Sequence, residues 1–233
     1  MSKRTITIES YKDALEVFHW ATKRHFQLWF TGQTHTRHRR TEIVLVRLVK
    51  NKMAISHLYQ GKLIYSKKRS LSEVVHGLAC TECLVRFYRS NMDGTAVPEK
   101  YFRGLGSIPE WGIIYPKGTM LLFEFCTKSN FYYTGNMRGK LSAYARNLSK
   151  IEKKFQVKAA VVFVLGIDRS AVERYVGSLG GVPPRSEGDR FPLDPFFFVD
   201  YETFLKVPFG NQLTAPIYIW TDGKTYPLRK EEK

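Results

Sequence analysis

One continuous apolar run, KAAVVFVLG at residues 158–166, constrains the fold of this chain more than any other segment. A strand with no polar alternation is buried on both faces, which requires a sheet that is covered on its two sides. From residue 71 onwards the patterns predict the order helix, strand, strand, strand, helix, strand. That order is typical of a mixed sheet with helices on its faces. The predicted fold class is therefore α/β, with an α+β mixed sheet.

Several other segments have the pattern of elements that would complete this sheet. Strands are expected at residues 101–105, 111–116, 119–127, 196–205 and 217–228. Lys117 and Gly118 separate two of these strands, which predicts a tight turn and an antiparallel hairpin. A helix over residues 135–155 would bury one side, which is formed by Leu141, Tyr144, Leu148 and Ile151.

The first 66 residues predict three helices followed by a hairpin. The helices are expected over residues 10–24, 25–30 and 34–52, and the strands at 54–59 and 62–66. The buried stripe of the third helix is expected to consist of Ile43, Leu45, Val46 and Val49. This order of elements resembles a winged helix, in which the third helix enters the major groove of DNA.

The charge of the chain favours a polyanionic partner. There are 37 Lys and Arg against 21 Asp and Glu, which gives a formal net charge of +16. We expect DNA contacts at the start of the third helix and around the hairpin, from Arg37, Arg39, Arg40, Lys62, Lys67 and Lys68. The alternatives are a basic helix face in solvent and docking on an anionic membrane surface.

The remaining composition indicates the cellular compartment of the protein. No apolar run approaches the roughly 20 residues that a membrane span needs, and no signal-peptide core follows the first residues. Three cysteines, an odd number, argue against a disulfide framework. We therefore expect a cytoplasmic protein with no membrane partner, and the sequence leaves its oligomeric state open.

Glu124 lies inside the otherwise apolar segment 120–126. Burial of a carboxylate without a partner would be costly, so a metal ion or a lysine should compensate it. Strand alternation places Glu124 and Cys126 on one face, together with Lys128 if the strand continues. Glu110 begins the preceding strand, and carboxylates on neighbouring strands suit Mg²⁺ or Mn²⁺. Such an ion can activate water for phosphodiester cleavage, while a lysine stabilises developing charge.

These motifs resemble the core of the PD-(D/E)xK nucleases, which have a restriction-endonuclease type of fold. More narrowly, residues 10–166 resemble the replication-relaxation family of mobile-element proteins, which is similar to one class of plasmid mobilisation relaxases. The resemblance rests on the winged-helix pattern, on Pro109-Glu110, on Phe123-Glu124 and on Lys140-Leu141 with Tyr144. It implies a winged-helix DNA-binding domain at 1–69 and a nuclease-like domain with a C-terminal extension at 70–233.

The resemblance implies a plasmid or phage protein that acts in replication initiation or in DNA relaxation by metal-dependent nicking. Two positions depart from the pattern, since Glu110 replaces the usual Asp and Cys126 occupies the place of the lysine. Lys128 or Lys140 would then have to serve the site. If neither does, the protein is a non-catalytic DNA-binding regulator or structural protein. Tyr144 has two interpretations, as a nucleophile on phosphorus or as a ring packed under the sheet.

The segment 71–90 is predicted to be a helix on which His76, Cys80 and Cys83 share a face. These residues and Cys126 could bind zinc, although small buried thiols are the commoner case. Glu82 on the same helix is interpreted either as an accessory acid or as a glutamate in solvent. Aromatic residues at 131–133 either stack on unpaired bases or fill the edge of the domain.

Overall fold

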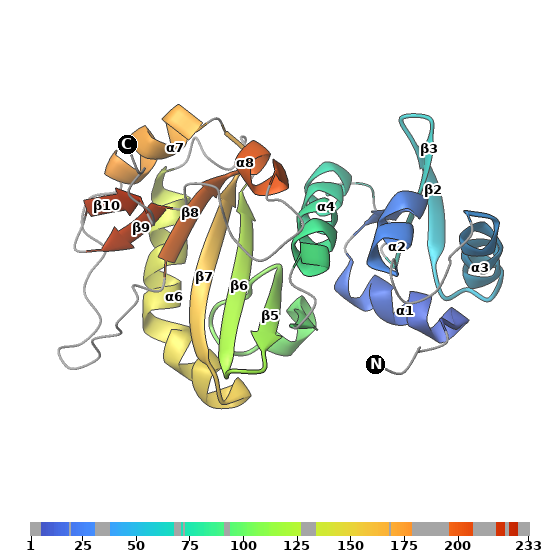
Figure 1. Cartoon of the computed structure of the whole chain (residues 1–233), viewed down its shortest axis with the longest axis horizontal. Coiled ribbons are helices and arrows are strands. Elements are labelled where there is room, and N and C mark those ends of the chain that lie inside the picture. The colour runs from blue at the N-terminus through green and yellow to red at the C-terminus, as the bar shows by residue number, and fades with distance from the viewer. Residues whose placement is uncertain are drawn as a thin grey trace. The chain divides into compact units, whose positions relative to one another are not determined.

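The computed structural model describes residues 6–18, 20–30, 38–67, 71, 73–90, 94–126, 134–167, 169–178, 196–206, 218–221 and 224–227. The chain divides into two compact units, Met1–Arg89 and Ser90–Lys233 (Figure 1). Sequence analysis placed this division earlier, between residues 69 and 70. In the residues that the structure describes, no helix combines the length and the apolar character that crossing a membrane requires.

The first unit consists of helices around a small sheet. Its elements are α1 (Ile8–Val17), β1 (Ala21–Thr22), α2 (Lys23–Trp29), α3 (His38–Lys50), β2 (Ile55–Tyr59), β3 (Lys62–Ser66) and α4 (Val74–Ser90). The three strands are antiparallel in the order β1-β3-β2. Gln60 and Gly61 both have positive φ, 46° and 72°, as the turn of a two-residue hairpin requires. The hairpin and three helices in the predicted order are confirmed. The helix predicted over residues 10–24 ends at Val17, and β1, which lies inside that range, was not foreseen.

The buried side of α3 differs from the prediction. Thr41, Leu45 and Leu48 are buried, while Ile43 and Val46 are exposed. Thr41 is tolerated in the core because Tyr11 of α1 donates its hydroxyl hydrogen to Thr41 Oγ1 at 3.2 Å. The prediction that Ile43 and Val46 are buried is therefore wrong.

Helix α4 belongs to the first unit through its packing. Val74 and Leu78 pack with Trp20 and Ile64 in one apolar cluster. At the other end of the helix the ring of Tyr88 stacks on Trp29 at a centroid distance of 4.3 Å. This packing explains why the first unit extends to Arg89 and does not end after the hairpin.

The second unit is built on a seven-stranded mixed sheet. Its elements are β4 (Thr95–Pro98), the 3-10 helix η1 (Glu99–Phe102), β5 (Trp111–Tyr115), β6 (Thr119–Cys126), α6 (Thr134–Phe155), β7 (Lys158–Leu165), α7 (Arg169–Ser178), β8 (Phe196–Asp200), α8 (Tyr201–Lys206), β9 (Tyr218–Thr221) and β10 (Lys224–Pro227). The order is β10-β9-β8-β7-β6-β5-β4, in which β6, β7 and β8 are parallel and the other pairs antiparallel. The predicted mixed α/β class is confirmed.

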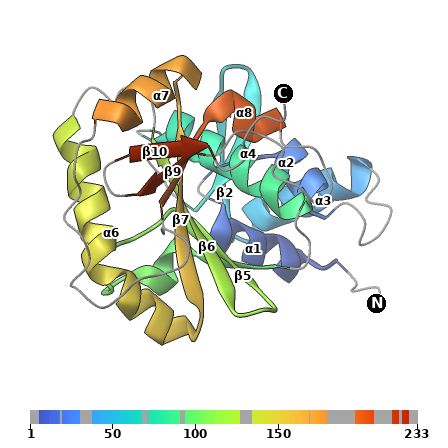
Figure 2. The same ribbon diagram turned by 60° about the vertical axis from the view of Figure 1, so that its left-hand side comes forward.

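Helices cover both faces of this sheet (Figure 2). On one face α6 packs with the residues that were predicted to form its apolar side, and Val172 of α7 joins the same core. On the other face Tyr201 and Phe204 of α8 pack against Phe125 and Phe123. Residues 161–165 of β7 are all buried, as the unbroken apolar run predicted.

Three segments of the second unit differ from the predicted strands. The predicted strand 217–228 comprises two antiparallel strands, β9 and β10. Residues 101–105 were expected to form a strand, but η1 occupies the first part and Gly104 and Gly106 have φ of 82° and 83°. Such positive φ values turn the chain and are incompatible with a strand. The predicted strand 196–205 ends at Asp200, and α8 follows at once.

Candidate functional site

The acid Glu124 in β6 is buried and paired. Its side chain faces α6, where Lys140 Nζ donates to Oε2 at 2.5 Å and the Tyr144 hydroxyl donates to Oε1 at 2.7 Å. Lys140 and Tyr144 are four residues apart, so they lie one above the other on the helix. Glu124 is 3% exposed. The expectation that a lysine compensates this acid is confirmed for Lys140, while Lys128 lies outside the described residues.

Glu110 lies at the bend before β5 and next to Glu124. Its N–H donates to the carbonyl oxygen of Phe123 at 2.9 Å. The register pairs Trp111 with Phe123, so one further step places Glu110 opposite Glu124. The negative charge of Glu110 acts to raise the pKa of Glu124. The two predicted acids are therefore neighbours, with Glu124 in β6 and Glu110 directly before β5.

Burial controls the electrostatics of this cluster. It raises the pKa of Glu124 above its ordinary value, against the opposing effects of Lys140 and Tyr144. Burial lowers the pKa of Lys140, but the neighbouring groups Glu124, Cys126 and Glu110 together outweigh this effect, so the net direction is upward. Burial and the neighbouring carboxylate raise the pKa of Tyr144 well above its usual range. Cys126, at the end of the same strand face, has its pKa raised to about 12 by burial.

This geometry limits the chemistry that the cluster can perform. The Tyr144 hydroxyl is buried and its hydrogen is donated to a carboxylate, an arrangement that holds the ring in place and keeps the oxygen protonated. Both carboxylate oxygens of Glu124 already accept a hydrogen bond, one of them from an ammonium group. The cluster therefore has the features of a structural ion pair, in which Glu124 and Tyr144 are buried and the side chain of Lys140 is 42% exposed.

The basic residues of the first unit lie on α3 and on the hairpin. Arg40 of α3 and Lys62 of β3 are exposed, as predicted. Lys67 is also exposed but forms an ion pair with Glu16 of α1. Two further cations of α3, Arg47 and Lys50, are exposed but were not predicted, because the cluster of arginines in the sequence lies in the first turn of that helix. Arg37, Lys68 and the side chain of Arg39 lie outside what the structure describes.

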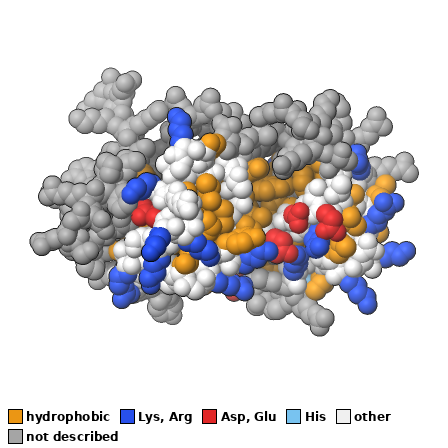
Figure 3. Space-filling view, turned by 90° about the horizontal axis from the view of Figure 1, so that it is seen from below, with side chains coloured by type: hydrophobic (Ala, Val, Ile, Leu, Met, Phe, Trp, Pro, Cys, Tyr) orange, Lys and Arg blue, Asp and Glu red, His pale blue; other side chains and the backbone are white. Residues whose placement is uncertain are grey.

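Charges of both signs share the surface. In the face drawn in Figure 3, Lys and Arg side chains are spread over the described part of the protein, with acidic side chains among them. One acid on α3 itself, Glu42, is paired with Lys23 of α2 at 3.0 Å. The ion pair reduces the repulsion that Glu42 would exert on an approaching polyanion.

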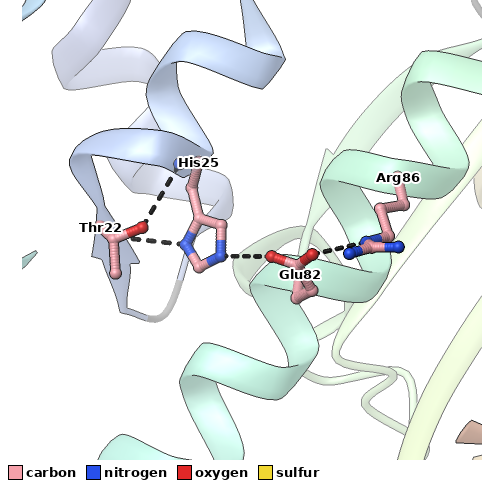
Figure 4. Close-up of polar contacts among 4 residues, drawn as sticks. All are labelled: Thr22, His25, Glu82 and Arg86. Atoms are coloured by element: carbon pink, nitrogen blue, oxygen red, sulfur yellow. Dashed lines mark hydrogen bonds and ion pairs between the residues drawn. The ribbon is translucent and has the colours of Figure 1, made fainter. Parts of the chain in front are cut away.

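A second polar cluster joins α2 to α4 inside the first unit (Figure 4). His25 Nε2 lies 2.8 Å from Oε2 of Glu82, and Arg86 Nε donates to Oε1 of the same carboxylate at 2.5 Å. The Thr22 N–H donates to His25 Nδ1 at 3.1 Å, which closes the capping box at the start of α2. Because Nδ1 accepts, we assign the ring hydrogen to Nε2, which donates to Glu82.

The charge of Glu82 is stabilised by this cluster. The hydrogen bond from His25, together with Arg86 and against the effect of burial, lowers the pKa of Glu82 to about 2. Glu82 is therefore not an acid in solvent, which corrects that interpretation, while a role as an accessory acid of the second unit stays a prediction. Sequence spacing offered no signal for the pair, since His25 and Glu82 are 57 residues apart.

The cysteines are buried, and one of them contacts a histidine on its own helix. His76 Nε2 lies 3.4 Å from Cys80 Sγ on α4. Cys80, Cys83 and Cys126 are all free thiols and all buried. The aromatic residues at 131–133 lie outside the described residues.

The fold and these clusters define a two-unit protein of mixed α/β class. Comparison of the chain with models of protein families, with curated proteins and with solved structures gives no match.

Proposed function

We propose that this chain is a DNA-binding protein whose first unit is a winged helix, and that the second unit is a nuclease-like domain without catalytic activity. The order α1-β1-α2-α3-β2-β3 and the sheet order β1-β3-β2 support the winged helix. In that fold the third helix enters the major groove. The observation that carries the proposal is the exposed side of the third helix, α3, with Arg40, Arg47 and Lys50.

The net charge of +16 supports the same partner. Each Lys or Arg that neutralises a phosphate releases a counterion, so the affinity of such a protein falls steeply with salt concentration. The resemblance to mobile-element proteins makes replication or mobilisation of such an element the proposed setting.

The closed state of Glu124 supports a non-catalytic second unit. The oxygen donors of Glu110 and Glu124 match hard divalent cations in chemistry. However, a cation at Glu124 would have to approach the ammonium group of Lys140, which lies 2.5 Å from the carboxylate. The residues present therefore fit an internal ion pair better than a Mg²⁺ or Mn²⁺ site.

The test of DNA binding is a salt titration of affinity for duplex DNA, in EDTA, with the full chain. The triple variant Arg40→Ala, Arg47→Ala, Lys50→Ala should weaken binding and reduce the slope of log affinity against log salt by up to about three units. The matched control replaces Arg146, Lys150 and Lys153 on the exposed side of α6, which removes the same charge from the second unit. Equal slopes for the two triple variants would contradict the proposal.

A second candidate function is metal-dependent nicking of DNA by the second unit. The observation that favours it is the position of Glu110 opposite Glu124, with Lys140 beside them. In that case the two acids would hold the ion and Lys140 would stabilise the charge that develops on phosphate. Incubation of the wild-type chain with supercoiled DNA and Mg²⁺ or Mn²⁺ distinguishes the candidates. Nicking that disappears in Glu124→Gln would favour the enzyme over the proposal above.

A further inference from the structure

We propose that Ile43 and Val46 of α3 contact thymine methyl groups in the major groove, so that the first unit selects duplexes with thymine at defined positions. This inference rests on the proposed DNA binding and adds to it the residues that select sequence.

The exposure of these two side chains is the first observation. Ile43 is 46% and Val46 is 61% exposed, although both are apolar. A single exposed apolar residue is ordinary and needs no function. Here two β-branched residues lie three apart, so they are neighbours on the same side of one helix. The core of the unit uses Thr41, Leu45 and Leu48 instead, which leaves Ile43 and Val46 outside the buried side of α3.

The charges around the pair indicate which partner covers it. Arg40, Ile43, Arg47 and Lys50 recur at spacings of three and four residues, so these cations border the apolar pair on one side. On the other side lies Glu42, four residues before Val46, whose charge is paired with Lys23. Arg40 and Lys50 are about 15 Å apart along the helix axis, and the major groove is about 12 Å wide. The two ends of α3 can therefore reach phosphates on opposite sides of a groove while the middle faces the bases.

The chemistry of the pair then selects the base. Neither Ile nor Val can donate or accept a hydrogen bond, so the groups on a base edge that they can recognise are apolar. In the major groove that group is the C5 methyl of thymine. Both side chains are stiff at χ1, so they present their methyl groups with little loss of entropy on binding. Their separation, about 5–6 Å between Cβ atoms, spans one to two base-pair steps of 3.4 Å.

The experiment removes the methyl group from the DNA and its partner from the protein. A preferred duplex is selected from a random pool with the wild-type chain, and each thymine is then replaced by deoxyuridine, which keeps base pairing. Loss of a methyl contact should weaken binding about fourfold, the equivalent of about 0.8 kcal/mol for one buried carbon group. In Ile43→Ala or Val46→Ala, the affinity for the thymine duplex should fall similarly, and deoxyuridine at the matching position should have no further effect.

Two variants serve as controls. Val75 of α4 is an apolar β-branched residue that is 63% exposed, and Val75→Ala should keep both affinity and thymine preference. Arg47→Ala should weaken binding to thymine and deoxyuridine duplexes equally and reduce the salt slope by about one unit.

The outcomes separate this inference from the function on which it rests. No salt-dependent binding to any duplex would overturn the proposed function. Binding without a preferred sequence, or with equal affinity for thymine and deoxyuridine, would overturn only the role of Ile43 and Val46. The role is also overturned if the alanine variants no longer self-associate but still bind the deoxyuridine duplex more weakly than the thymine duplex. In that case a second copy of the chain, and not DNA, would cover this side of α3.

Discussion

Tyr144 of α6 donates its hydroxyl hydrogen to Oε1 of Glu124 in β6, where both side chains are buried. The carboxylate is thus held by a neutral donor on one oxygen and by Lys140 on the other. Of these three groups, Lys140 alone reaches solvent, since its side chain is 42% exposed and those of the other two are buried. This asymmetry makes the effects of single substitutions in the cluster predictable.

Removal of Lys140 should destabilise the second unit more than removal of the charge on Glu124. Lys140→Met leaves a buried carboxylate without its cation, so the free energy of unfolding should fall by about 3 kcal/mol. This value is at the low end for buried ion pairs, because solvent partly screens the charge of Lys140. Glu124→Gln keeps the shape and an acceptor for Tyr144, and should change the free energy of unfolding by less than about 1.5 kcal/mol. Urea unfolding of both variants at pH 7 measures the difference. A larger loss in Glu124→Gln would show that the ion pair itself stabilises the fold.

The pH dependence of Glu124 has a defined sign. Its folded-state pKa lies above the ordinary 4.5. Such a group contributes stability that is fully present below about pH 4.5 and is lost as pH rises through the folded pKa. The melting temperature of wild type relative to Glu124→Gln should therefore fall between pH 4.5 and neutrality. Calorimetry at several pH values measures this difference, and a constant difference would contradict the assignment.

Glu82 in the first unit should behave in the opposite way. Its pKa is about 2 in the folded state against 4.5 for the ordinary group. Its contribution, roughly 2–3 kcal/mol, should be present above pH 4.5 and lost as pH falls towards 2. In Glu82→Gln this loss should be absent, although the variant is less stable at pH 7. Thermal unfolding of both proteins from pH 6 to pH 2 tests it, and parallel curves for the two would refute the effect.

The three thiols should be unreactive in the folded protein. Cys80, Cys83 and Cys126 are buried, burial raises the pKa of Cys83 well above its usual range, and that of Cys126 is about 12. Since the thiolate is the reactive form, a disulfide reagent at pH 8 should modify none of them until denaturant is added. Rapid modification of one thiol in the native protein would be evidence against this packing.

A fragment of residues 1–89 should fold, and a fragment of residues 1–69 should not. The shorter one lacks Val74 and Leu78, which pack against Trp20 and Ile64, and it lacks Glu82, the partner of His25. Circular dichroism and cooperative urea unfolding of the two fragments compare them directly. Equal cooperativity would favour the boundary at residue 69 that the sequence predicted.

The sequence predicted the features that depend on local pattern. The apolar run of β7, the hairpin of β5 and β6, and the apolar side of α6 were all predicted because each is set by neighbours within a few residues. The lysine partner of Glu124 was predicted from the cost of burying a carboxylate, and Lys140 was among the two residues considered.

The features that were missed depend on contacts between distant segments. Two sides of α3 have residues at helical spacing. Ile43 and Val46 lie on the exposed side, and Thr41 and Leu45 lie on the buried side. Periodicity alone therefore does not predict which side of the helix is buried. A hydrogen bond from Tyr11, thirty positions earlier in the chain, allows Thr41 into the core. The pairing of His25 with Glu82 likewise depends on how α4 folds back, which no local pattern encodes.

The late position of α4 in the chain has a consequence during synthesis. Helices α1, α2 and α3 and the hairpin all precede α4 in the chain, so the residues of α4 that cover Trp20 and Ile64 are made after them. At 5–20 residues per second, a ribosome needs roughly one to five seconds to proceed from Ser66 to Arg89. Until α4 docks, the apolar cluster of Trp20 and Ile64 lacks Val74 and Leu78, so we expect the nascent first unit to expose part of its apolar surface.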